Sequence, residues 1–401
     1  MNVVFLTLSR IQNVNERGIY TDLMRKFRDE GHQVYIVFPR ERQFHQATSL
    51  VLQDGIQLLG VKTLNIQKTN IVEKGIGTIL LESQFKRAIQ KCLKDVAFDL
   101  ILYSTPPITL TNVVRFLKSK NPGAKTYLLL KDIFPQNAVD LQMFSEKSLF
   151  YRYFRHKEVA LYKISDYIGC MSPANVDFVL RHNPFILPER VEVAPNSISL
   201  VQDNKLLDRN KIRQKYNLPL DKPIFIYGGN LGKPQGIDFL IQCLRANSHR
   251  ADCYFLIVGN GTEYVKLAGW YQKEKPQNVS LFAGLPKEDY DCLVQACDVG
   301  LIFLDYRFTI PNYPSRLLSY LECKMPILAV TDPNTDIGSI AEQNGYGYKC
   351  ASNQVKEFTA CVNNFVQNPH VIKIMGEKGY RYLLEHYLVD YTYKKIVAHF
   401  G

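Results

Sequence analysis

The chain has 401 residues, of which 46% are hydrophobic and 22% charged, and it carries a net charge of +11. This balance is typical of a globular protein and excludes a fibrous repeat or a disordered chain. The length fits two domains better than one. A basic surplus of this size favours anionic partners, such as acidic lipid head groups, phosphorylated substrates or nucleic acid, without choosing among them.

The cysteines and the lengths of the apolar runs indicate where in the cell the protein is located. Nine cysteines are scattered through the sequence, and none belongs to a Cys-x-x-Cys pair or to a zinc-ligand pattern with histidine. An odd number of thiols, most of them in apolar runs, predicts a reducing environment. No apolar run approaches the roughly 20 residues that span a bilayer, and the apolar start of the chain lacks the basic leader of a signal peptide. We therefore expect a cytoplasmic protein that is at most peripheral to a membrane.

Short β-branched runs alternate with helical patterns from the first residues onward. The first helical pattern covers residues 18–30 and ends at a Gly-His break. The strands predicted in this half lie at 3–8, 34–38, 100–103, 126–130, 167–170 and 191–194. Regular alternation of strand and helix predicts a parallel sheet that is covered on both faces.

The alternation restarts after a polar connector at 199–222, which holds a short helix at 211–216. The strands predicted in the second half lie at 224–227, 253–258, 279–282, 299–303 and 327–330, and residues 369–400 have helical periodicity alone. We expect an α/β protein with two doubly wound, Rossmann-like domains: 1–200 together with a crossover helix at 380–401, and 220–379. Such folds bind ligands at the carboxyl ends of their strands, so we expect a cleft between the two domains.

The most informative segment joins a predicted strand to a predicted helix through a glycine-rich turn. It reads YGGNLGKPQG at 227–236, and the helix follows from Ile237. Glycines let main-chain N–H groups approach a phosphate, and the start of a helix adds favourable partial charge. Lys233 adds a full charge. The pattern is neither a P-loop nor a dinucleotide fingerprint, and a tight turn without any ligand is the alternative.

Three further segments belong to the same edge of the second domain. VGNG at 258–261 and AGLP at 283–286 each follow a predicted strand, and the main chain of the latter can contact a base edge. NYPSRLLSYLE at 312–322 opens a helix with Arg316 in its first turn. An arginine there is usually solvated or paired, but beside a phosphate site its forked guanidinium becomes a diphosphate ligand.

These segments together resemble the GT-B glycosyltransferases, in particular the mostly retaining bacterial enzymes of family 4. Within that family the similarity is to transferases of O-antigen and capsule gene clusters, including N-acetylfucosamine transferases. In the first domain the resemblance rests on KDIFPQ at 131–136, SDYI at 165–168, MSP at 171–173 and APNS at 194–197. It extends over essentially the whole chain, including the C-terminal crossover helix.

The resemblance implies a metal-independent enzyme that transfers a sugar from a nucleotide-sugar, expected to be a UDP-sugar, to a lipid-linked saccharide at the inner face of the cell membrane. Lys233 and Arg316 would stabilise the departing diphosphate electrostatically. Neither a cofactor, nor a metal ion, nor nucleic acid is expected. The implied donor-binding residues are Gly229, Asn230, Gly232, Gly259, Asn260, Leu285, Ser319 and Glu322.

The chain departs from the family pattern in two places. Asn230 and Gln235 occupy positions where the phosphate loop of the family often has arginine and lysine. The family's Glu-x7-Glu pair, whose second glutamate usually holds the donor ribose, is replaced by Pro311 and Ser319. Glu322 lies one turn further along, in a different register. The stereochemical outcome therefore does not follow from the resemblance.

The first domain supplies candidates for acceptor chemistry. Asp132 follows the strand at 126–130 and faces the expected cleft, where its carboxylate can act as a general base on the acceptor hydroxyl or orient the acceptor. The alternative is that Asp132 caps the following turn. In the loop after the first strand, Asn15, Arg17 and Gly18 are candidates for contact with acceptor or phosphate, or are simply solvated.

One predicted helix, at 146–163, interleaves basic and aromatic residues, a composition suited to the surface of an anionic membrane. The alternative is a helix whose aromatic residues pack on the sheet while its cations reach solvent. Two other functions compete with glycosyl transfer. One is a GT-B sugar-nucleotide epimerase, which needs no acceptor. The other is a basic nucleic-acid-binding protein, for which no reading helix or zinc finger is evident.

Overall fold

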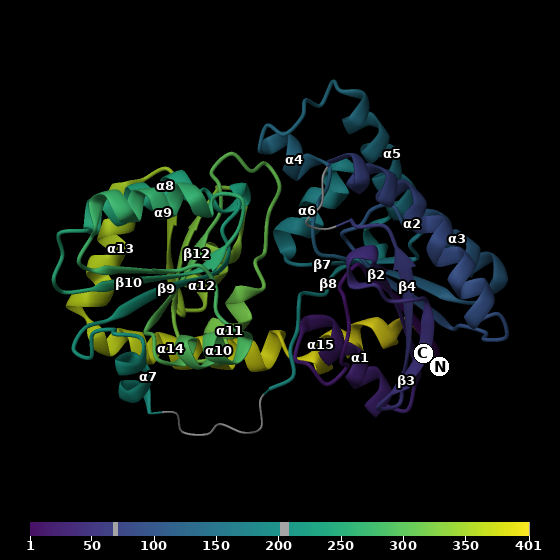
Figure 1. The fold of residues 1–401 in the computed structure, drawn as a ribbon, viewed down its shortest axis with the longest axis horizontal. Helices are drawn as coiled ribbons and strands as arrows, with labels where there is room; N and C mark the ends of the chain where they lie inside the picture. Colours follow the sequence, from purple (N-terminus) through teal and green to yellow (C-terminus); the bar gives the residue numbers. More distant parts are fainter. Residues whose placement is uncertain (67–70, 201–207, 401) are drawn as a thin grey trace. The chain divides into compact units, whose positions relative to one another are not determined.

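A computed structural model of the chain describes residues 1–66, 71–200 and 208–400 (Figure 1). The chain forms two compact units: unit 1 is Met1–Ser199 with Val389–Gly401, and unit 2 is Leu200–Leu388. Each unit has its own sheet, of eight strands in unit 1 and six in unit 2. Every strand but β3 has a parallel neighbour, and helices connect most of the successive strands. The predicted α/β class with two Rossmann-like domains is confirmed.

The unit boundaries differ from the expected domains at the C-terminal crossing. Residues 380–388, which the sequence analysis gives to the first domain, belong to unit 2. The reason is that Pro369–His386 form one continuous helix, α14, which packs against α11 (Arg316–Glu322) of unit 2. The chain returns to unit 1 only at Val389, whose N–H donates to the carbonyl oxygen of Ile198 at 3.1 Å.

The sheet of unit 1 has the order β3-β4-β2-β1-β5-β6-β7-β8. Six of its strands are those that the sequence predicts, and their observed bounds differ from the predicted ranges by a few residues. The sequence analysis does not predict β3 and β4. The strands are β1 (Asn2–Leu6), β2 (Gln33–Glu41), β3 (Ser49–Gln53), β4 (Ile56–Thr63), β5 (Leu100–Ser104), β6 (Lys125–Leu130), β7 (Tyr167–Cys170) and β8 (Val191–Val193).

Helices cover both faces of this sheet. On one face α1 and α15 pack over β1 and β2, and their apolar side chains form one core with Phe5, Phe27 and Ile396. On the other face α2 packs on β4 and α3 packs on β5. The helices of unit 1 are α1 (Ile19–Asp29), α2 (Ile71–Cys92), α3 (Thr111–Lys120), α4 (Gln136–Asp140), α5 (Leu149–Ile164), α6 (Pro173–His182) and α15 (Val389–Val397), with short 3-10 turns η1 (Arg42–Phe44), η2 (Pro188–Arg190) and η4 (Ala398–Phe400).

The sheet of unit 2 has the order β11-β10-β9-β12-β13-β14, so its first strand in sequence lies at the centre. This is the strand order of dinucleotide-binding sheets. The strands are β9 (Ile224–Asn230), β10 (Tyr254–Asn260), β11 (Val279–Phe282), β12 (Val299–Phe303), β13 (Ile327–Thr331) and β14 (Gly347–Ala351).

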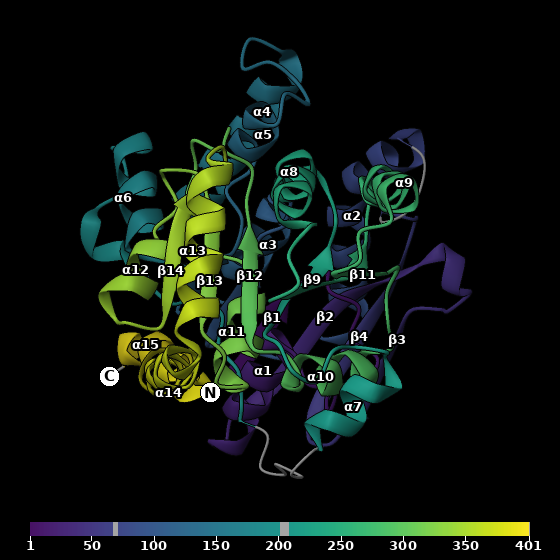
Figure 2. The ribbon, with the colours of Figure 1, turned by 90° about the vertical axis from the view of Figure 1, so that its left-hand side faces the viewer.

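The main core of unit 2 lies between this sheet and the helices α8, α9 and α13, with Phe225, Phe255, Phe303 and Phe358 in contact near its centre. Figure 2 shows these helices on one side of the sheet and α10, α11 and α14 on the other. The helices of unit 2 are α7 (Arg209–Lys215), α8 (Ile237–Asn247), α9 (Tyr264–Glu274), α10 (Lys287–Gln295), α11, α12 (Ile337–Gln343), α13 (Val355–Gln367) and α14, with the 3-10 turn η3 (Lys233–Gln235).

The sequence analysis does not predict three strands, β3, β4 and β14. One of them, β3, shows that the expectation of an all-parallel sheet in unit 1 is wrong. β3 pairs antiparallel with β4, so the sheet of unit 1 is not parallel throughout. The turn between them contains Asp54 and Gly55 at φ of +46° and +75°. An Asp-Gly pair between apolar runs is a strong hairpin signal. The third strand, β14, begins with Gly347 and has few β-branched residues, so its sequence resembles a loop.

In the part of the chain that the structure describes, none of the helices combines the length and the apolar composition needed to traverse a bilayer.

The docking of α15 on α1 should contribute strongly to the stability of unit 1. Ile396 is fully buried in the core of unit 1, so Ile396→Ala should lower the free energy of unfolding by about 2–4 kcal/mol through lost packing. Urea unfolding followed by circular dichroism should show this as an earlier transition. The fluorescence of Trp270, the only tryptophan, reports on unit 2. Its unfolding transition should therefore occur at the same urea concentration as in the wild type.

The matched control is Ile374→Ala, because Ile374 is 53% exposed on α14 and its truncation should change stability by less than about 0.5 kcal/mol. Equal shifts in the two isoleucine variants would show that α15 does not stabilise unit 1 in this way.

Candidate functional site

The central strands of unit 2 separate at their carboxyl ends. β9 pairs with β10 from Ile224 to Asn230, but it pairs with β12 at only two positions, Phe225 and Ile226. The connections that leave β9 and β12 lead to opposite sides of the sheet. This is a topological switch point, where doubly wound sheets bind ligands.

Tyr320 of α11 occupies the gap between the two strands. Its hydroxyl accepts from the N–H of Gly228 at 3.2 Å and lies 3.2 Å from the carbonyl oxygen of Ile226 and 3.3 Å from that of Leu301. The ring lies directly against Gly300, where any side chain would collide with it. Tyr320 therefore satisfies main-chain groups that lack a strand partner and keeps the strands apart.

Arg316 lies at the mouth of this gap, as the first residue of α11. Its guanidinium carbon is 4.3 Å from the centroid of the Tyr227 ring, which is a cation–π contact. A Cβ atom added to Gly229, whose φ is +120°, would lie 3.5 Å from one guanidinium nitrogen. A side chain at that position would strain the turn and fill the space in front of the cation.

The charge of Arg316 is not neutralised within the described residues. Its Nη1 atom is buried without a hydrogen-bond partner, and none of the carboxylates in residues 1–66, 71–200 and 208–400 forms an ion pair with it. A buried polar group without a partner is costly, and a buried charge more so. The arrangement is that of a preformed binding site for an anion.

A third tyrosine, Tyr290 of α10, completes the surroundings. Its hydroxyl fills the space beside Gly228, where a Cβ atom would overlap it. Burial raises the pKa of Tyr290 to about 12, although the nearby Arg316 lowers it. Tyr290 is therefore neutral at physiological pH and adds no negative charge beside Arg316.

Side chains within the glycine-rich turn bond some of the groups that were expected to bind a ligand. The Oε1 atom of Gln235 accepts from the N–H of Gly232 at 3.1 Å and from the amide of Asn230 at 3.2 Å. The N–H of Leu231 donates to the carbonyl oxygen of Asn260 at 2.9 Å. Two main-chain donors expected to bind phosphate are therefore engaged inside the protein. Lys233 is exposed and makes no ion pair with any residue that the structure describes.

Gly259 and Asn260 both have contacts within unit 2 that explain their presence without a ligand. A Cβ atom on Gly259 would overlap the carbonyl oxygen of Gly229, so this glycine allows β9 and β10 to approach. The side chain of Asn260 is exposed and accepts from the N–H of Gly261 at 2.8 Å. Leu285 is half-buried in the loop after β11, next to Gly284 at φ +141°.

On α11, Ser319 follows Arg316 by three residues and therefore shares its face of the helix. Glu322 is six residues from Arg316, which places it on a different face. Both residues are half-buried. The structure thus groups Ser319, but not Glu322, with Arg316.

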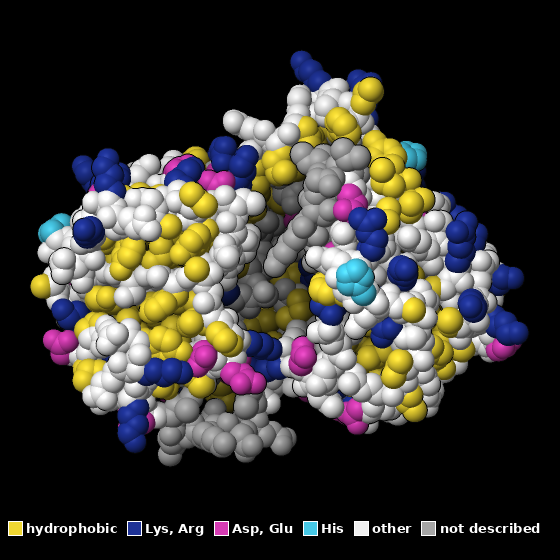
Figure 3. Space-filling view, viewed as in Figure 1, with side chains coloured by type: hydrophobic (Ala, Val, Ile, Leu, Met, Phe, Trp, Pro, Cys, Tyr) yellow, Lys and Arg dark blue, Asp and Glu magenta, His cyan; other side chains and the backbone are white. Residues whose placement is uncertain are grey.

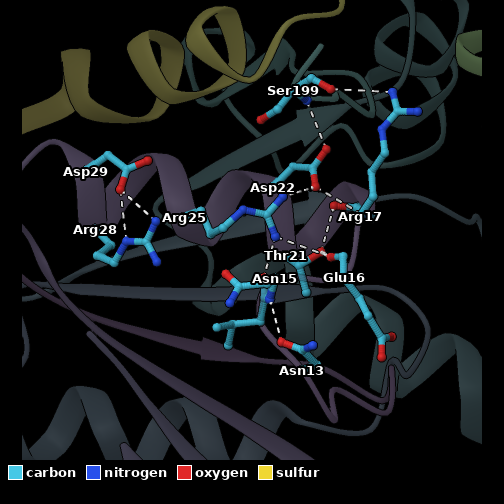
Figure 4. A network of polar contacts seen from close by, with 12 residues as sticks. Asn13, Asn15, Glu16, Arg17, Thr21, Asp22, Arg25, Arg28, Asp29 and Ser199 are labelled. Atoms are coloured by element: carbon cyan, nitrogen blue, oxygen red, sulfur yellow. Dashed lines mark hydrogen bonds and ion pairs between the residues drawn. The ribbon is translucent and has the colours of Figure 1, made fainter. Parts of the chain in front are cut away.

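In unit 1 the loop after β1 is held by a buried carboxylate (Figure 4). Asp22 is fully buried and accepts from the N–H of Gly18 at 3.0 Å and from the N–H of Ser199 at 2.9 Å. Arg25 pairs with it at 2.6 Å. Arg17 donates to the carbonyl oxygen of Ser199 at 3.4 Å. The expected ligand loop is therefore anchored to the segment at which the chain leaves unit 1.

Of the three candidates in this loop, Gly18 and Arg17 contact residues of their own unit, as just described. Asn15 is exposed, and its N–H donates to the side chain of Asn13 at 2.9 Å. Its side chain therefore extends from the loop surface.

Asp132 and its neighbour Lys131 lie at the carboxyl end of β6. Asp132 accepts from the amide of Asn137 at 2.8 Å, which is a bond within the following turn, as the capping alternative expects. Burial raises the pKa of its carboxyl group. The amine of Lys131 donates to the carbonyl oxygen of Ala194 at 3.1 Å, and burial lowers its pKa to about 7.

The sequence analysis missed Lys131, Tyr290 and Tyr320 as components of these sites. Tyr320 lies in the segment NYPSRLLSYLE, and its spacing of four residues from Arg316 puts the two side chains on one face of the helix. Tyr290 had none, because only the folded sheet brings α10 to Gly228.

Comparison with known proteins finds similarity to glycosyltransferases. Residues 208–382 match the family model of the glycosyl transferases group 1. The chain is similar to "Probable glycosyltransferase WbjE" of Pseudomonas aeruginosa, with 22% identity over 349 residues, covering 85% of this chain and 83% of that one.

Two solved structures share the fold over nearly the whole length. HepE of Anabaena in complex with UDP has a TM-score of 0.70 and 14% identity, covering 100% of this chain and 99% of that one. WaaG, a glycosyltransferase involved in lipopolysaccharide biosynthesis, has a TM-score of 0.66 and 15% identity, covering 99% of both chains.

The contact between Gly259 and Gly229 can be tested without a ligand. Gly259→Ala places a methyl group on the carbonyl oxygen of Gly229, so we expect a loss of stability of about 1–3 kcal/mol. The control is Gly269→Ala in α9, where a Cβ atom meets nothing within 4 Å and alanine should stabilise the helix by about 0.5–1 kcal/mol. Thermal unfolding by circular dichroism measures both. A Gly259 variant as stable as the Gly269 variant would contradict the close approach of β9 and β10.

Proposed function

We propose that this chain is a glycosyltransferase that uses a UDP-sugar as donor and a lipid-linked saccharide as acceptor in the synthesis of a bacterial surface polysaccharide. The observation that carries the donor assignment is the unneutralised guanidinium of Arg316 at the switch point of unit 2, beside Gly229. A nucleoside diphosphate supplies the anion that such a site lacks. The family match of residues 208–382 and the similarity to HepE, solved with UDP, support this choice.

In this proposal Arg316 and Lys233 act on the leaving group. When the bond between the anomeric carbon and the diphosphate oxygen breaks, negative charge grows on UDP, and fixed positive groups stabilise it. The tyrosines around Arg316 hold the guanidinium without neutralising it, because burial raises the pKa of the Tyr320 and Tyr227 hydroxyls. A divalent metal ion has no part in this proposal.

Asp132 is the group of unit 1 that we propose for the acceptor. Burial raises the pKa of its carboxyl group, which makes the carboxylate a better acceptor for the proton of an attacking hydroxyl. Its bond to Asn137 orients the carboxylate. Asn15, Arg17 and Gly18 are proposed to bind acceptor or phosphate, and the bonds to Ser199 and Asp22 set the position of that loop.

The donor proposal predicts a graded loss of UDP affinity. Arg316→Ala should weaken UDP binding in isothermal titration calorimetry by about 1.5–3 kcal/mol, because a charge-assisted bond to the diphosphate is lost. Arg316→Lys should recover only part of it, because the two-pronged geometry is lost. Lys233→Ala should cost less, about 0.2–1 kcal/mol, because Lys233 is exposed.

The matched control is Lys266→Ala, which removes an exposed lysine that pairs with Asp238 and Glu263 on unit 2 and should leave UDP affinity unchanged. Uridine, which has no diphosphate, should bind weakly to wild type and to Arg316→Ala alike. Unchanged UDP affinity in a folded Arg316→Ala protein would overturn the donor site. Loss of the UDP-sugar without acceptor present would instead indicate an epimerase or hydrolase.

Membrane association belongs to the same proposal, and we propose a contact surface at the start of α5. Arg155 and Lys157 of α5 do not serve it, because Arg155 bonds Glu158 and Asn183 at 2.6 Å each and Lys157 lies 3.6 Å from Glu82. These bonds hold α5 on unit 1, so we leave Arg155 and Lys157 out of the proposed contact surface.

The start of α5 has the character of a membrane-contacting surface. Leu149 and Phe150 are 80% and 69% exposed, and Met143 in the preceding loop is 63% exposed. Arg152 is exposed beside them. Figure 3 shows hydrophobic and basic side chains together over the α4–α5 end of unit 1. We propose that this end, which we call the α5 tip, inserts into an anionic lipid surface.

Liposome sedimentation tests the α5 tip. Wild type should pellet with vesicles that contain anionic lipid and less with neutral vesicles, since each Lys or Arg near such a surface contributes about 1 kcal/mol. Leu149→Ser with Phe150→Ser should reduce pelleting through lost apolar burial. The control is Val265→Ser, a residue 80% exposed on unit 2. If the double variant and the control pellet equally, the tip is not the contact.

A further inference from the structure

The outer edge of the sheet in unit 1 is the short strand β3. It pairs antiparallel with β4 on one side and stands last in the order of the sheet (Figure 2). No other strand of the described chain pairs with its second side. An edge of this kind is a template for another strand, and proteins usually blunt it with charges, proline or a covering element.

None of the usual protective features is present in β3. Residues 46–53 contain neither a charged residue nor proline. The three central residues, Leu50, Val51 and Leu52, are 38%, 47% and 63% exposed. Because side chains alternate along a strand, Leu50 and Leu52 share one face and Val51 lies on the other. The edge is therefore apolar on both faces.

The strand is also held rigidly in place. The side chain of Gln53 accepts from the N–H of Val14 at 3.0 Å, and Arg28 donates to the carbonyl oxygen of Asp54 at 2.9 Å. At the other end, Arg40 donates to the hydroxyl of Ser49 at 2.5 Å. Little ordering entropy would therefore be lost if a partner strand paired with it.

We propose that β3 pairs antiparallel with β3 of a second copy of this chain, about a two-fold axis that passes through Val51. In this register Val51 faces Val51 of the partner, and Leu50 faces Leu52 of the partner in both arms. Ser49 then faces Gln53. The two eight-stranded sheets become continuous, and the exposed apolar side chains on both faces are covered.

The sequence of β3 favours a second copy over an unrelated partner because it is self-complementary. The strand reads Ser-Leu-Val-Leu-Gln, which is nearly symmetric about Val51. An axis through Leu50 would instead place Val51 opposite Ser49, and an axis through Leu52 would place Val51 opposite Gln53. Only the axis through Val51 pairs all three apolar residues with apolar residues.

The contact is narrow, so the dimer should be reversible. An interface made by one strand edge falls at the low end of interface sizes, below roughly 1,200 Å². We therefore expect wild type to change from monomer to dimer over the micromolar range in sedimentation-velocity ultracentrifugation. Wild type that remains monomeric up to about 500 μM, a free energy of association weaker than about −4.5 kcal/mol, would overturn the proposal.

Variants of β3 test the partner and the register together. Val51→Lys places two like charges opposite each other on the axis and should give monomers throughout the range. Leu50→Lys combined with Leu52→Lys should also give monomers. Leu50→Lys combined with Leu52→Glu should dimerise, because each lysine then faces a glutamate of the other copy.

The matched control is Val265→Lys, which replaces an exposed valine on unit 2 and should dimerise as wild type does. Circular dichroism verifies that each variant is folded, which the exposure of all three positions favours. If the Lys/Glu variant is as monomeric as the Lys/Lys variant, the proposed register is wrong. If Val51→Lys dimerises like wild type, β3 is not the interface.

Discussion

The separation of β9 from β12 is the constraint on which the site in unit 2 depends. Parallel strands normally satisfy each other's main-chain groups, and here they cease to do so after Ile226. The Tyr320 hydroxyl takes over, bonding to groups of both strands. Because Tyr320 and Arg316 lie one helical turn apart on α11, the side chain that holds the gap also fixes the cation at its mouth.

The contacts of Arg316 suit the anion-binding role that we propose for it. A carboxylate partner would stabilise a buried guanidinium more strongly, but it would also compete with an incoming anion. Aromatic contacts provide attraction without negative charge. Tyr227 supplies such a contact, and Gly229 leaves the space beside the guanidinium empty. In the proposed function, the free-energy cost of leaving this charge unpaired is offset when the diphosphate binds.

Much of the fold followed from the sequence because buried parallel strands have a plain pattern. The strands β7, β11 and β12 begin and end where the periodicity predicts. The β3–β4 hairpin was not predicted, although its Asp-Gly turn is a local signal. The reason is that an alternation of strands and helices was expected, and a hairpin interrupts that alternation. The crossover at Val389 depends on tertiary packing of α14 against α11, which no local pattern contains.

The site was predictable where its residues follow strands of one sheet, and not where a side chain closes its own loop or the register of two strands decides the contact. Gly229 and Arg316 were expected near each other because both follow strands of one sheet, and in the structure the guanidinium of Arg316 lies 3.5 Å from where a Cβ atom of residue 229 would be. The engagement of Gly232 by Gln235 was not expected, because a side chain that closes its own loop looks in the sequence like one that contacts a ligand. The role of Gly259 is steric and requires the register of β9 and β10.

The two crossings between the units have a consequence for synthesis of the chain. Unit 2 is inserted between Ser199 and Val389, so a ribosome makes about 190 residues, in roughly 10–40 s, before α15 emerges. During that time the apolar surface around Phe27, later covered by Tyr393 and Ile396, faces solvent or a chaperone. Unit 1 therefore matures last although its first residues are made first, and the nascent chain carries an exposed apolar patch for as long as unit 2 is being translated.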